Sequence, residues 1–406
     1  MPQERIDINL EELQQQLDGE LQWDLASVLQ YATDASAYRA IPIAVALPQN
    51  RRDLTALIGF AAKSGIPLIP RAAGTSLAGQ VVGNGIVVDI SNHWTRILEL
   101  NVQEAWVRVE PGVILDELNA LLKPHGLCFG PETSTSNRCM IAGMVGNNSC
   151  GAHSIVYGST RDHTLSVKMM LDDGQEYEFG PLSKEEFESK LSLDTREGEI
   201  YRQMYGLLSP DDIQTEIINQ YPDPSIKRRN TGYALDLLLD NEVLGSNSAP
   251  LNMCKLIAGS EGTLGFITEV KLNLVPLPPK AKGLVCVHLA TREEAFKANL
   301  IALKYSPSAV ELMDHLILDC TKGNIELQRN REFIDGNPGA ILIVEFDRNT
   351  FEEIEGIAQS MEAEMRAAGY GYHFPLLQGD NINKVWACLL YTSPSPRDRT
   401  RSRMPS

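Results

Sequence analysis

The stretch from Pro70 to Gln80 has the composition of a loop that binds a phosphate group. It combines Gly74 and Gly79 with Thr75, Ser76 and several alanines. Glycine permits positive φ angles and close approach of the backbone, and consecutive exposed N–H groups form a concave site for an anion. An ordinary Gly/Ser-rich surface loop has the same composition, so this stretch alone leaves both interpretations open.

Two further segments are rich in glycine. Residues 130–160 are small and polar but carry too little charge for a solvated linker, and Ile141, Met144 and Val145 favour packing over disorder. Such a segment inside a compact domain usually surrounds a ligand. The other segment, Gly259 to Gly265, is predicted to form a turn between two apolar runs.

A basic patch at residues 227–233 reads Lys-Arg-Arg-Asn-Thr-Gly-Tyr. Guanidinium groups pair bidentately with carboxylates and phosphates, so the patch is a candidate anion clamp. A solvated turn is the alternative, and for this patch taken alone it is the favoured interpretation.

The composition restricts the class of protein. The chain has 406 residues, which predicts two or three domains, and its net charge of −17 argues against nucleic-acid and polybasic membrane-surface roles. The sequence shows neither a membrane-spanning apolar run nor a signal peptide, so we expect a cytoplasmic protein. The seven cysteines include no Cys-x-x-Cys pair, which predicts reduced thiols without an iron–sulfur cluster or zinc knuckle.

The apolar patterns predict strands and helices in alternation around these segments. Residues 1–36 are predicted to be a helical segment, with Leu10, Leu13, Leu17 and Leu21 on one face. A strand at 43–47, a helix at 53–63 ended by a glycine, a strand at 66–69 and a return strand at 85–90 follow, which indicates an α/β subdomain. Further strands are expected at 97–100, 106–110, 165–171 and 266–275, with a helix at 114–122 and a charged helical insertion at 181–220.

Pro276, Pro278 and Pro279 predict a domain boundary, because clustered prolines continue neither a sheet nor a helix. Beyond it, strands at 284–289 and 340–346 alternate with helices at 292–305 and 351–368. The predicted domains are therefore 1–36, 37–277, 278–387 and a tail at 388–406.

Taken together, these segments resemble the FAD-dependent D-2-hydroxyacid dehydrogenases, a family that includes D-lactate and D-2-hydroxyglutarate dehydrogenases and the glycolate oxidase FAD subunit. The resemblance extends from about residue 30 to residue 386. It implies an α+β fold, with a PCMH-type FAD-binding domain of two α/β subdomains followed by an incomplete α+β substrate-cap domain. It also implies oxidation of a D-2-hydroxy acid, D-lactate or D-2-hydroxyglutarate, to the 2-oxo acid by hydride transfer to flavin N5.

The resemblance implies specific site residues. The expected FAD contacts are Arg71, Ala72, Ala73, Gly74, Thr75, Ser76, Gln80, Pro131, Ser134, Gly143, Asn147, Gly151, Tyr157, Gly158, Glu261, Gly262 and Ile267. The expected substrate-carboxylate contacts are Lys227, Arg229, Thr231 and Tyr233. No histidine is placed for a covalent flavin bond; His153 lies in the glycine-rich segment, where polar groups are often incidental.

Two features depart from the family pattern. Ala72 and Ala73 stand where relatives usually have more glycine, and an alanine fits only where φ is negative. From Cys388 onward the sequence resembles translated adapter text, so we expect residues 388–406 to be a non-native, disordered tail of an N-terminal fragment. Family features further downstream, a divalent-metal site and an iron–sulfur cluster, are then expected only in the missing part, and no catalytic base or metal ligand is assigned here.

Three alternatives stay open at this stage. Another flavoenzyme of the same fold, such as UDP-N-acetylenolpyruvoylglucosamine reductase or an aldehyde oxidase flavin subunit, is disfavoured by the Arg229–Tyr233 motif and the proline-bounded cap. A Rossmann NAD enzyme is disfavoured because no Gly-x-Gly-x-x-Gly opens a helix after a first strand. A flavin-binding fragment without turnover is the third. The sequence identifies neither the electron acceptor nor the particular small-molecule 2-hydroxy acid.

Overall fold

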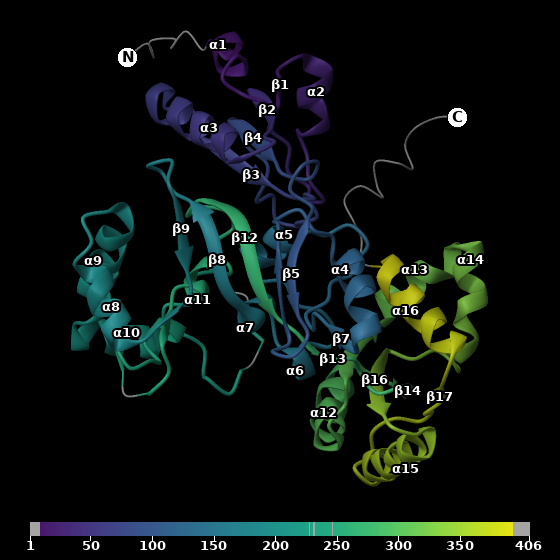
Figure 1. Cartoon of the computed structure of the whole chain (residues 1–406). Helices are drawn as coiled ribbons and strands as arrows, with labels where there is room; N and C mark the ends of the chain where they lie inside the picture. The colour runs from purple at the N-terminus through teal and green to yellow at the C-terminus, as the bar shows by residue number, and fades with distance from the viewer. Residues whose placement is uncertain (1–8, 227, 230–231, 246, 393–406) are drawn as a thin grey trace. The chain divides into compact units, whose positions relative to one another are not determined.

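The computed structural model describes residues 9–226, 228–229, 232–245 and 247–392 and divides into two compact units (Figure 1). The first unit, called the flavin unit below after the FAD-binding domain that the resemblance implies, comprises Met1–Cys150 and Ser159–Val275. The second, the cap unit, comprises Gly151–Gly158 and Pro276–Ser406. Each unit combines helices with sheet, as the predicted α+β class requires.

The flavin unit begins with a four-stranded sheet of order β1-β2-β4-β3. The helix α3 (Arg51–Ser64) buries Leu54 and Leu57 in the same core as Val88 of the sheet. This helix starts at the Asn50 cap and ends where Gly65 takes a φ of 69°, as the sequence predicted. The strands are β1 (Glu20–Gln22), β2 (Ala44–Leu47), β3 (Leu68–Arg71) and β4 (Ile86–Asp89), preceded or interrupted by the short helices α1 (Leu10–Gln14) and α2 (Leu25–Gln30).

The prediction of one helical segment over residues 1–36 was wrong. Leu21 lies in β1, which pairs antiparallel with β2, so it joins the sheet edge instead of a helical face. The chain is extended there because the N–H groups of Asp18 and Gly19 bind the Asp53 carboxylate, at 2.8 and 3.0 Å. A side chain at Gly19 would lie 2.2 Å from the Leu47 carbonyl oxygen.

The strand expected at 85–90 forms as β4, but the expectation that it returns antiparallel to the strand at 66–69 was wrong. Strands β3 and β4 are parallel, with Ile69 opposite Val87. Two neighbouring parallel strands need a crossover connection, so the residues between Arg71 and Ile86 form a long loop that leads back to the end of the sheet where β3 begins. This crossover carries Pro70–Gln80, the candidate phosphate-binding segment.

The second subdomain of the flavin unit is a five-stranded antiparallel sheet of order β5-β6-β12-β8-β9. One face packs against α4 (Leu115–Leu122) and α5 (Ile141–Asn147) through a core that includes Val109, Leu118 and Val145. The strands are β5 (Ile97–Asn101), β6 (Trp106–Val109), β8 (Thr164–Met170), β9 (Glu176–Phe179) and β12 (Phe266–Asn273). The insertion forms α8 (Lys184–Leu191), α9 (Arg196–Leu208) and α10 (Asp211–Gln220); short elements are η1 (Lys123–His125), β7 (Leu127–Cys128), α7 (Thr160–His163), β10 (Pro181–Leu182), η2 (Asp236–Leu238), β11 (Leu251–Asn252), α11 (Cys254–Ile257) and β13 (Val275–Pro276).

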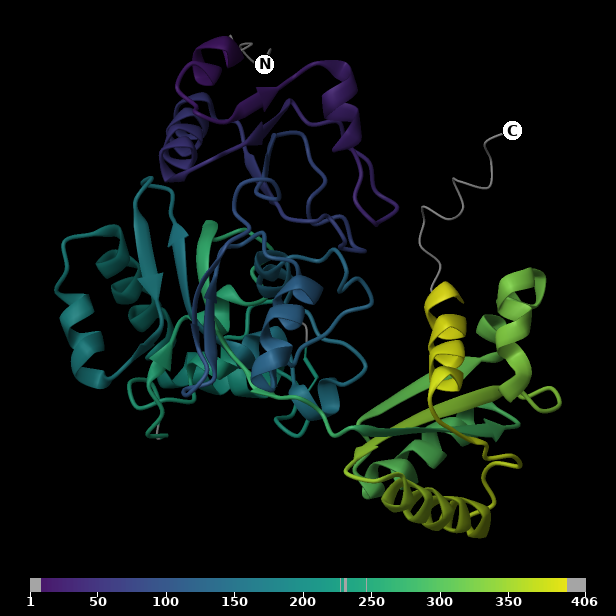
Figure 2. The same ribbon diagram turned by 45° about the vertical axis from the view of Figure 1, so that its right-hand side comes forward.

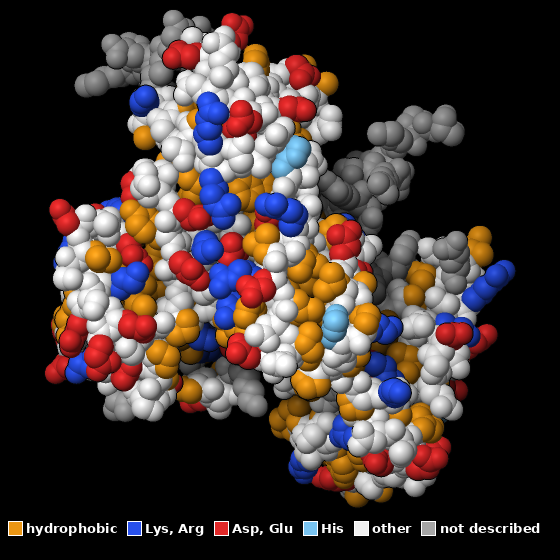
Figure 3. Space-filling view, in the orientation of Figure 1, with side chains coloured by type: hydrophobic (Ala, Val, Ile, Leu, Met, Phe, Trp, Pro, Cys, Tyr) orange, Lys and Arg blue, Asp and Glu red, His pale blue; other side chains and the backbone are white. Residues whose placement is uncertain are grey.

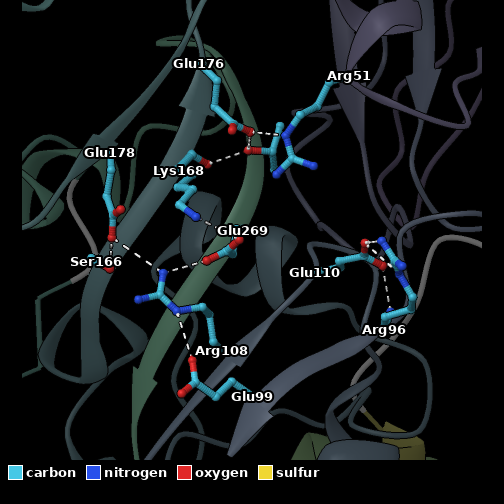
Figure 4. Close-up of polar contacts among 11 residues, drawn as sticks. Arg51, Arg96, Glu99, Arg108, Glu110, Ser166, Lys168, Glu176, Glu178 and Glu269 are labelled. Atoms are coloured by element: carbon cyan, nitrogen blue, oxygen red, sulfur yellow. Dashed lines mark hydrogen bonds and ion pairs between the residues drawn. The ribbon is translucent and has the colours of Figure 1, made fainter.

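The other face of this sheet carries interleaved acidic and basic side chains (Figure 3). Glu269 is buried at its centre and accepts from Arg108 at 2.6 Å and from Lys168 at 3.2 Å (Figure 4). Arg51 of α3 reaches Glu176 of β9 at 2.5 Å, which ties the two subdomains of the flavin unit together.

The cap unit is built on an antiparallel sheet of order β15-β16-β14-β17. Helices α12 (Arg292–Ala302) and α15 (Phe351–Ala367) cover one face, and α13 (His315–Cys320) and α16 (Asp380–Thr392) lie on the other (Figure 2). The remaining elements are α6 (Ser154–Tyr157), β14 (Ala281–Leu289), η3 (Leu303–Tyr305), β15 (Ala309–Asp314), η4 (Thr321–Gly323), α14 (Ile325–Gln328), η5 (Arg329–Phe333), β16 (Ala340–Arg348) and β17 (Leu376–Leu377).

The end of α16 corrects part of the expected tail. The helix continues to Thr392, and Cys388 is fully buried in the cap core, so residues 388–392 are helical and not a disordered start. The rest of the expected tail, 393–406, lies outside the described residues. In the described part of the chain, no helix combines the length and apolarity that crossing a bilayer would take.

Candidate functional site

Three segments that the sequence singled out meet in the flavin unit. The loop after β3 contacts α5, where a Cβ on Gly143 would lie 3.3 Å from the Ala72 methyl group. The turn at 259–265 contacts the other end of α5, because the Glu261 N–H donates to the Gly146 carbonyl at 2.9 Å. It also contacts the start of the loop, where a Cβ on Gly262 would lie 3.3 Å from Pro70. Segments nearly two hundred residues apart thus form one site.

The loop presents a row of backbone donors. The N–H groups of residues 73–77 donate to no acceptor within the described residues. Gly74 has a φ of 64° and Gly79 a φ of 81°, which only glycine adopts without strain. Unsatisfied donors that are partly shielded from water cost free energy, so such a row is suited to an anion.

Glu261 connects the three segments by its side chain. Its Oε1 accepts from Asn147 of α5 at 3.0 Å and from Gln80 of the loop at 3.4 Å. Burial raises the pKa of Glu261, and these two hydrogen bonds oppose that effect. Its φ of 52° is rare for a residue with a side chain, and strain of this kind collects at functional sites.

The Arg71 side chain supports the conformation of the loop. The guanidinium is buried and donates to the carbonyl oxygens of Thr33 and Tyr31 at 3.0 and 3.4 Å. A Cβ on Gly74 would lie 2.6 Å from Arg71 Nη2, so the loop can fold over this side chain only with glycine at 74. Arg71 therefore shapes the row of donors through the backbone.

The remaining expected cofactor residues divide between the units. In the flavin unit, Pro131 is buried and Ser134 exposed in the loop before α5, and Ile267 lies in β12 opposite Met169. Gly151, Tyr157 and Gly158 belong to the cap unit, around the single turn of α6.

The expected substrate residues fall between 227 and 233, and the described residues 228–229 and 232–236 are called the strip below. Lys227 and Thr231 fall outside the described residues. The Arg229 guanidinium is paired with the Asp236 carboxylate. Tyr233 is 40% exposed, and its hydroxyl bonds Thr263 of the turn at 2.5 Å. This bond places the strip beside the turn at 259–265, whereas Arg229 is already neutralised by an acid.

Sequence reasoning missed Arg161, the side chain that joins the strip to the turn. It is buried and donates to the Ala258 carbonyl oxygen from Nε at 3.0 Å and to the Gly232 carbonyl oxygen from Nη2 at 2.7 Å. No periodicity or spacing marks this residue in the sequence, because its partners are backbone carbonyls.

The cap unit has a buried charged cluster that sequence reasoning also missed. His153 Nε2 lies 2.8 Å from Glu345 Oε1, and Lys282 Nζ contacts Glu345 at 3.0 Å and Asp347 at 3.1 Å. Trp386 Nε1 donates to the other Glu345 oxygen at 3.0 Å. Burial would raise the pKa of Glu345, but the His153 hydrogen bond and the Lys282 charge lower it to about 2.

Donor atoms of His153, Glu345 and Asp347 lie within 4.8 Å of one another, a spacing that a metal ion could use. The Lys282 ammonium contacts both carboxylates but balances only one of their two charges. The described residues thus form an ion-pair network here without a metal ion.

Comparison with known families identifies the cofactor. Residues 42–180 match the model of the FAD binding domain, and residues 278–402 match that of the FAD linked oxidases, C-terminal domain. The chain carries the two domains of the FAD-linked oxidases. The predicted family resemblance, the PCMH-type FAD fold and FAD as the cofactor are confirmed.

Similar proteins support the same assignment. The D-2-hydroxyglutarate dehydrogenases of Pseudomonas putida and Escherichia coli are 34% identical over 349 residues and 35% identical over 345 residues. These matches cover 84% and 83% of this chain but only 34% and 33% of the relatives, so the chain spans about a third of their length. The Bacillus subtilis glycolate oxidase subunit GlcD is 24% identical over 83% of this chain and 58% of its own.

A solved alkyldihydroxyacetonephosphate synthase shares the fold, with a TM-score of 0.61 at 16% identity over 93% of this chain and 61% of that one.

The residues of the flavin unit fit the FAD pyrophosphate. The row of N–H groups at 73–77 supplies donors without competing acceptors among the described residues. Gly143 lets α5 approach the loop closely. A pyrophosphate is the anionic part of FAD, and backbone N–H groups in such a concavity are its usual partners.

Proposed function

We propose that this chain binds FAD as part of a dehydrogenase that oxidises a D-2-hydroxy acid to the 2-oxo acid. The observation that carries the proposal is the convergence of the Pro70–Gln80 loop, α5 and the 259–265 turn around donors that have no acceptor in the described chain. The D-2-hydroxyglutarate dehydrogenases among its relatives support the substrate class.

FAD, when bound, supplies a hydride acceptor at flavin N5. In the proposal, the residues of this chain bind the FAD and orient the substrate. The N–H groups of residues 73–77 hold the pyrophosphate, and Glu261 keeps Gln80 and Asn147 in place around it. The described residues of the strip, Arg228, Arg229 and Tyr233 among them, face the substrate carboxylate in this proposal, with Tyr233 fixed by Thr263.

The substrate contacts need a cation for each carboxylate. Arg229 is paired with Asp236, whereas Arg228 is exposed and forms no ion pair within the described ranges. We therefore assign Arg228 to substrate recognition with the expected contacts Lys227, Arg229, Thr231 and Tyr233. A dicarboxylate such as D-2-hydroxyglutarate would use a second cation, and D-lactate would not.

The other parts of the proposal concern surroundings. The physiological partner is a small-molecule 2-hydroxy acid, and the electrons pass from the flavin to an acceptor that we leave unassigned. The proposed compartment is the cytoplasm, which fits seven cysteines without a Cys-x-x-Cys pair.

Anaerobic reduction tests the proposal. The purified chain is loaded with FAD, and its visible spectrum is recorded before and after D-2-hydroxyglutarate, D-lactate or, as a control, L-lactate. Bleaching by a D-2-hydroxy acid alone supports turnover. A yellow protein that no D-2-hydroxy acid bleaches supports the alternative, flavin binding without turnover. A folded protein that takes up no FAD refutes both.

A further inference from the structure

Arg161 occupies an unusual position for a charged side chain. It is 4% exposed, and its acceptors are backbone carbonyls: Ala258 O at 3.0 Å from Nε and 2.5 Å from Nη2, and Gly232 O at 2.7 Å. No carboxylate lies within ion-pair distance of it in the part of the chain that the structure describes. Burial lowers the pKa of Arg161, yet a guanidinium stays charged in proteins. The carboxylates of Asp162 and Asp236 favour its charge from beyond ion-pair distance. Burying a cation without a directly paired carboxylate is costly, which argues for a specific role.

The contacts of Arg161 join segments that are otherwise separate. Gly232 belongs to the strip, and Ala258 leads into the 259–265 turn that lies against α5. The turn is attached to α5 independently, since the Gly259 N–H donates to the Val145 carbonyl oxygen at 2.9 Å. Arg161 therefore attaches the strip to the 259–265 turn, which is itself attached to α5.

Gly259 and Asn148 also take part in this connection between the strip and the 259–265 turn, called the junction below. A Cβ on Gly259 would lie 2.5 Å from Arg161 Nη2 and 2.8 Å from Gly232 O, so the junction requires glycine there. Asn148, which ends α5 with a φ of 52°, accepts from the Arg161 N–H at 2.8 Å and donates to the Arg229 carbonyl oxygen at 3.3 Å. The strip is thus held at Arg229 by Asn148 at the end of α5 and at Gly232 by Arg161 of α7.

We propose that Arg161 is a positioning residue that holds the strip, at Gly232, in place beside the 259–265 turn, and so sets the site for the substrate carboxylate. The part concerning the substrate rests on the proposed function. The guanidinium fork spans two carbonyls at once, which an ammonium on a lysine stem cannot reproduce with the same geometry. Arg161→Lys should therefore keep the positive charge but no longer hold the strip in place beside the turn.

The test uses the full chain loaded with FAD, in the variants Arg161→Lys and Gly259→Ala, the second of which disturbs the same junction from the other side. Arg202→Lys is the matched control, because Arg202 also binds two backbone carbonyls, those of Leu191 and Leu193 at 2.8 Å, in the insertion. Three quantities are measured: amide hydrogen exchange of the strip, the Kd of FAD, and the Kd of 2-oxoglutarate from its perturbation of the flavin spectrum.

In both test variants we expect strip amides to exchange about tenfold faster and 2-oxoglutarate to bind about tenfold more weakly, since each lost charge-assisted bond is worth roughly a factor of ten. In Arg161→Lys the Kd of FAD and the exchange of the four-stranded sheet should change less than about threefold. Gly259 lies in the 259–265 turn itself, so Gly259→Ala is judged by strip exchange alone. Arg202→Lys should change none of these quantities. A general loss of stability would move all three quantities together.

Unchanged strip exchange in both variants would overturn the positioning role, whatever the substrate. Faster strip exchange with unchanged 2-oxoglutarate affinity would show that Arg161 holds the strip but that the strip does not bind the substrate. A wild-type protein that binds FAD but no 2-oxo acid would contradict the proposed substrate instead, and the exchange measurement would still decide the role of Arg161 in holding the strip.

Discussion

Replacing Glu345 with glutamine should destabilise the cap unit strongly. Its carboxylate is 2% exposed and bonded to His153, Lys282 and Trp386. Lowering its pKa from 4.5 to about 2 on folding corresponds to roughly 3 kcal/mol of stability at neutral pH. Removing one partner from a buried ion pair costs a similar amount. We therefore expect Glu345→Gln to lower the free energy of unfolding of the cap by about 3 kcal/mol.

The sign of the pH dependence follows from the direction of the shift. The folded pKa of Glu345 lies below the unfolded one, so its contribution is complete above about pH 5 and is lost as pH falls toward 2. Wild-type cap stability should decrease between pH 5 and pH 3.5, and the glutamine variant should show a shallower decrease over the same range.

Urea unfolding followed by tryptophan fluorescence measures both effects. Trp386 is the only tryptophan of the sequence after Trp106, and its indole donates to Glu345, so it reports on the cap locally. Glu364→Gln is the matched control, since Glu364 pairs with Lys304 at the surface of the same unit, where ion pairs contribute little. Equal urea midpoints for wild type and Glu345→Gln at pH 7 would refute the reasoning, as would equal losses in the test and control variants.

Three further changes have defined outcomes. Gly74→Ala should raise the Kd of FAD about tenfold, because Gly74 has a φ of 64° and the new Cβ would lie 2.6 Å from Arg71 Nη2. Gly59→Ala in α3, where a Cβ would meet nothing within 4 Å, should leave the Kd of FAD unchanged. Equal Kd values in the two variants would contradict the assignment of the loop to FAD binding. The buried His288 ring has Nδ1 2.9 Å from the Cys286 carbonyl oxygen, and its Nε2 accepts from the Asp335 N–H at 3.2 Å. Burial lowers the pKa of His288, so the stability of the cap unit in urea should fall as the pH drops below about 6.5. His288→Gln should remove this part of the pH dependence. Glu269→Gln should lower the thermal midpoint of the flavin unit by several degrees, as one broken buried ion pair predicts, with Glu99→Gln at the exposed end of the same network as a near-neutral control.

Local patterns carried the sequence predictions that succeeded. The helix α3 has an apolar face, an Asn cap and a terminal glycine, and it formed within two residues of its predicted bounds. The three glycine-rich segments were chosen because small residues leave backbone donors accessible, and the structure brings the parts of them at 70–80, 143–147 and 259–265 together.

Non-local pairing explains what the sequence could not predict. Leu21 follows the apolar spacing of a helix, but Asp53, far along the chain, binds the backbone at Asp18 and draws the segment into the sheet edge. The parallel pairing of β3 with β4 leaves no local signal, because both strands are short apolar runs. Arg161 and Glu345 act through carbonyls and distant charges, so neither residue type nor spacing marks them.

Titration of the apoprotein with FAD tests the central claim most directly. The account predicts saturable uptake at a single site, with quenched flavin fluorescence, and weaker uptake in Gly74→Ala than in Gly59→Ala. A protein that is folded by circular dichroism and shows no saturable FAD uptake, or the same Kd in wild type and Gly74→Ala, would contradict it.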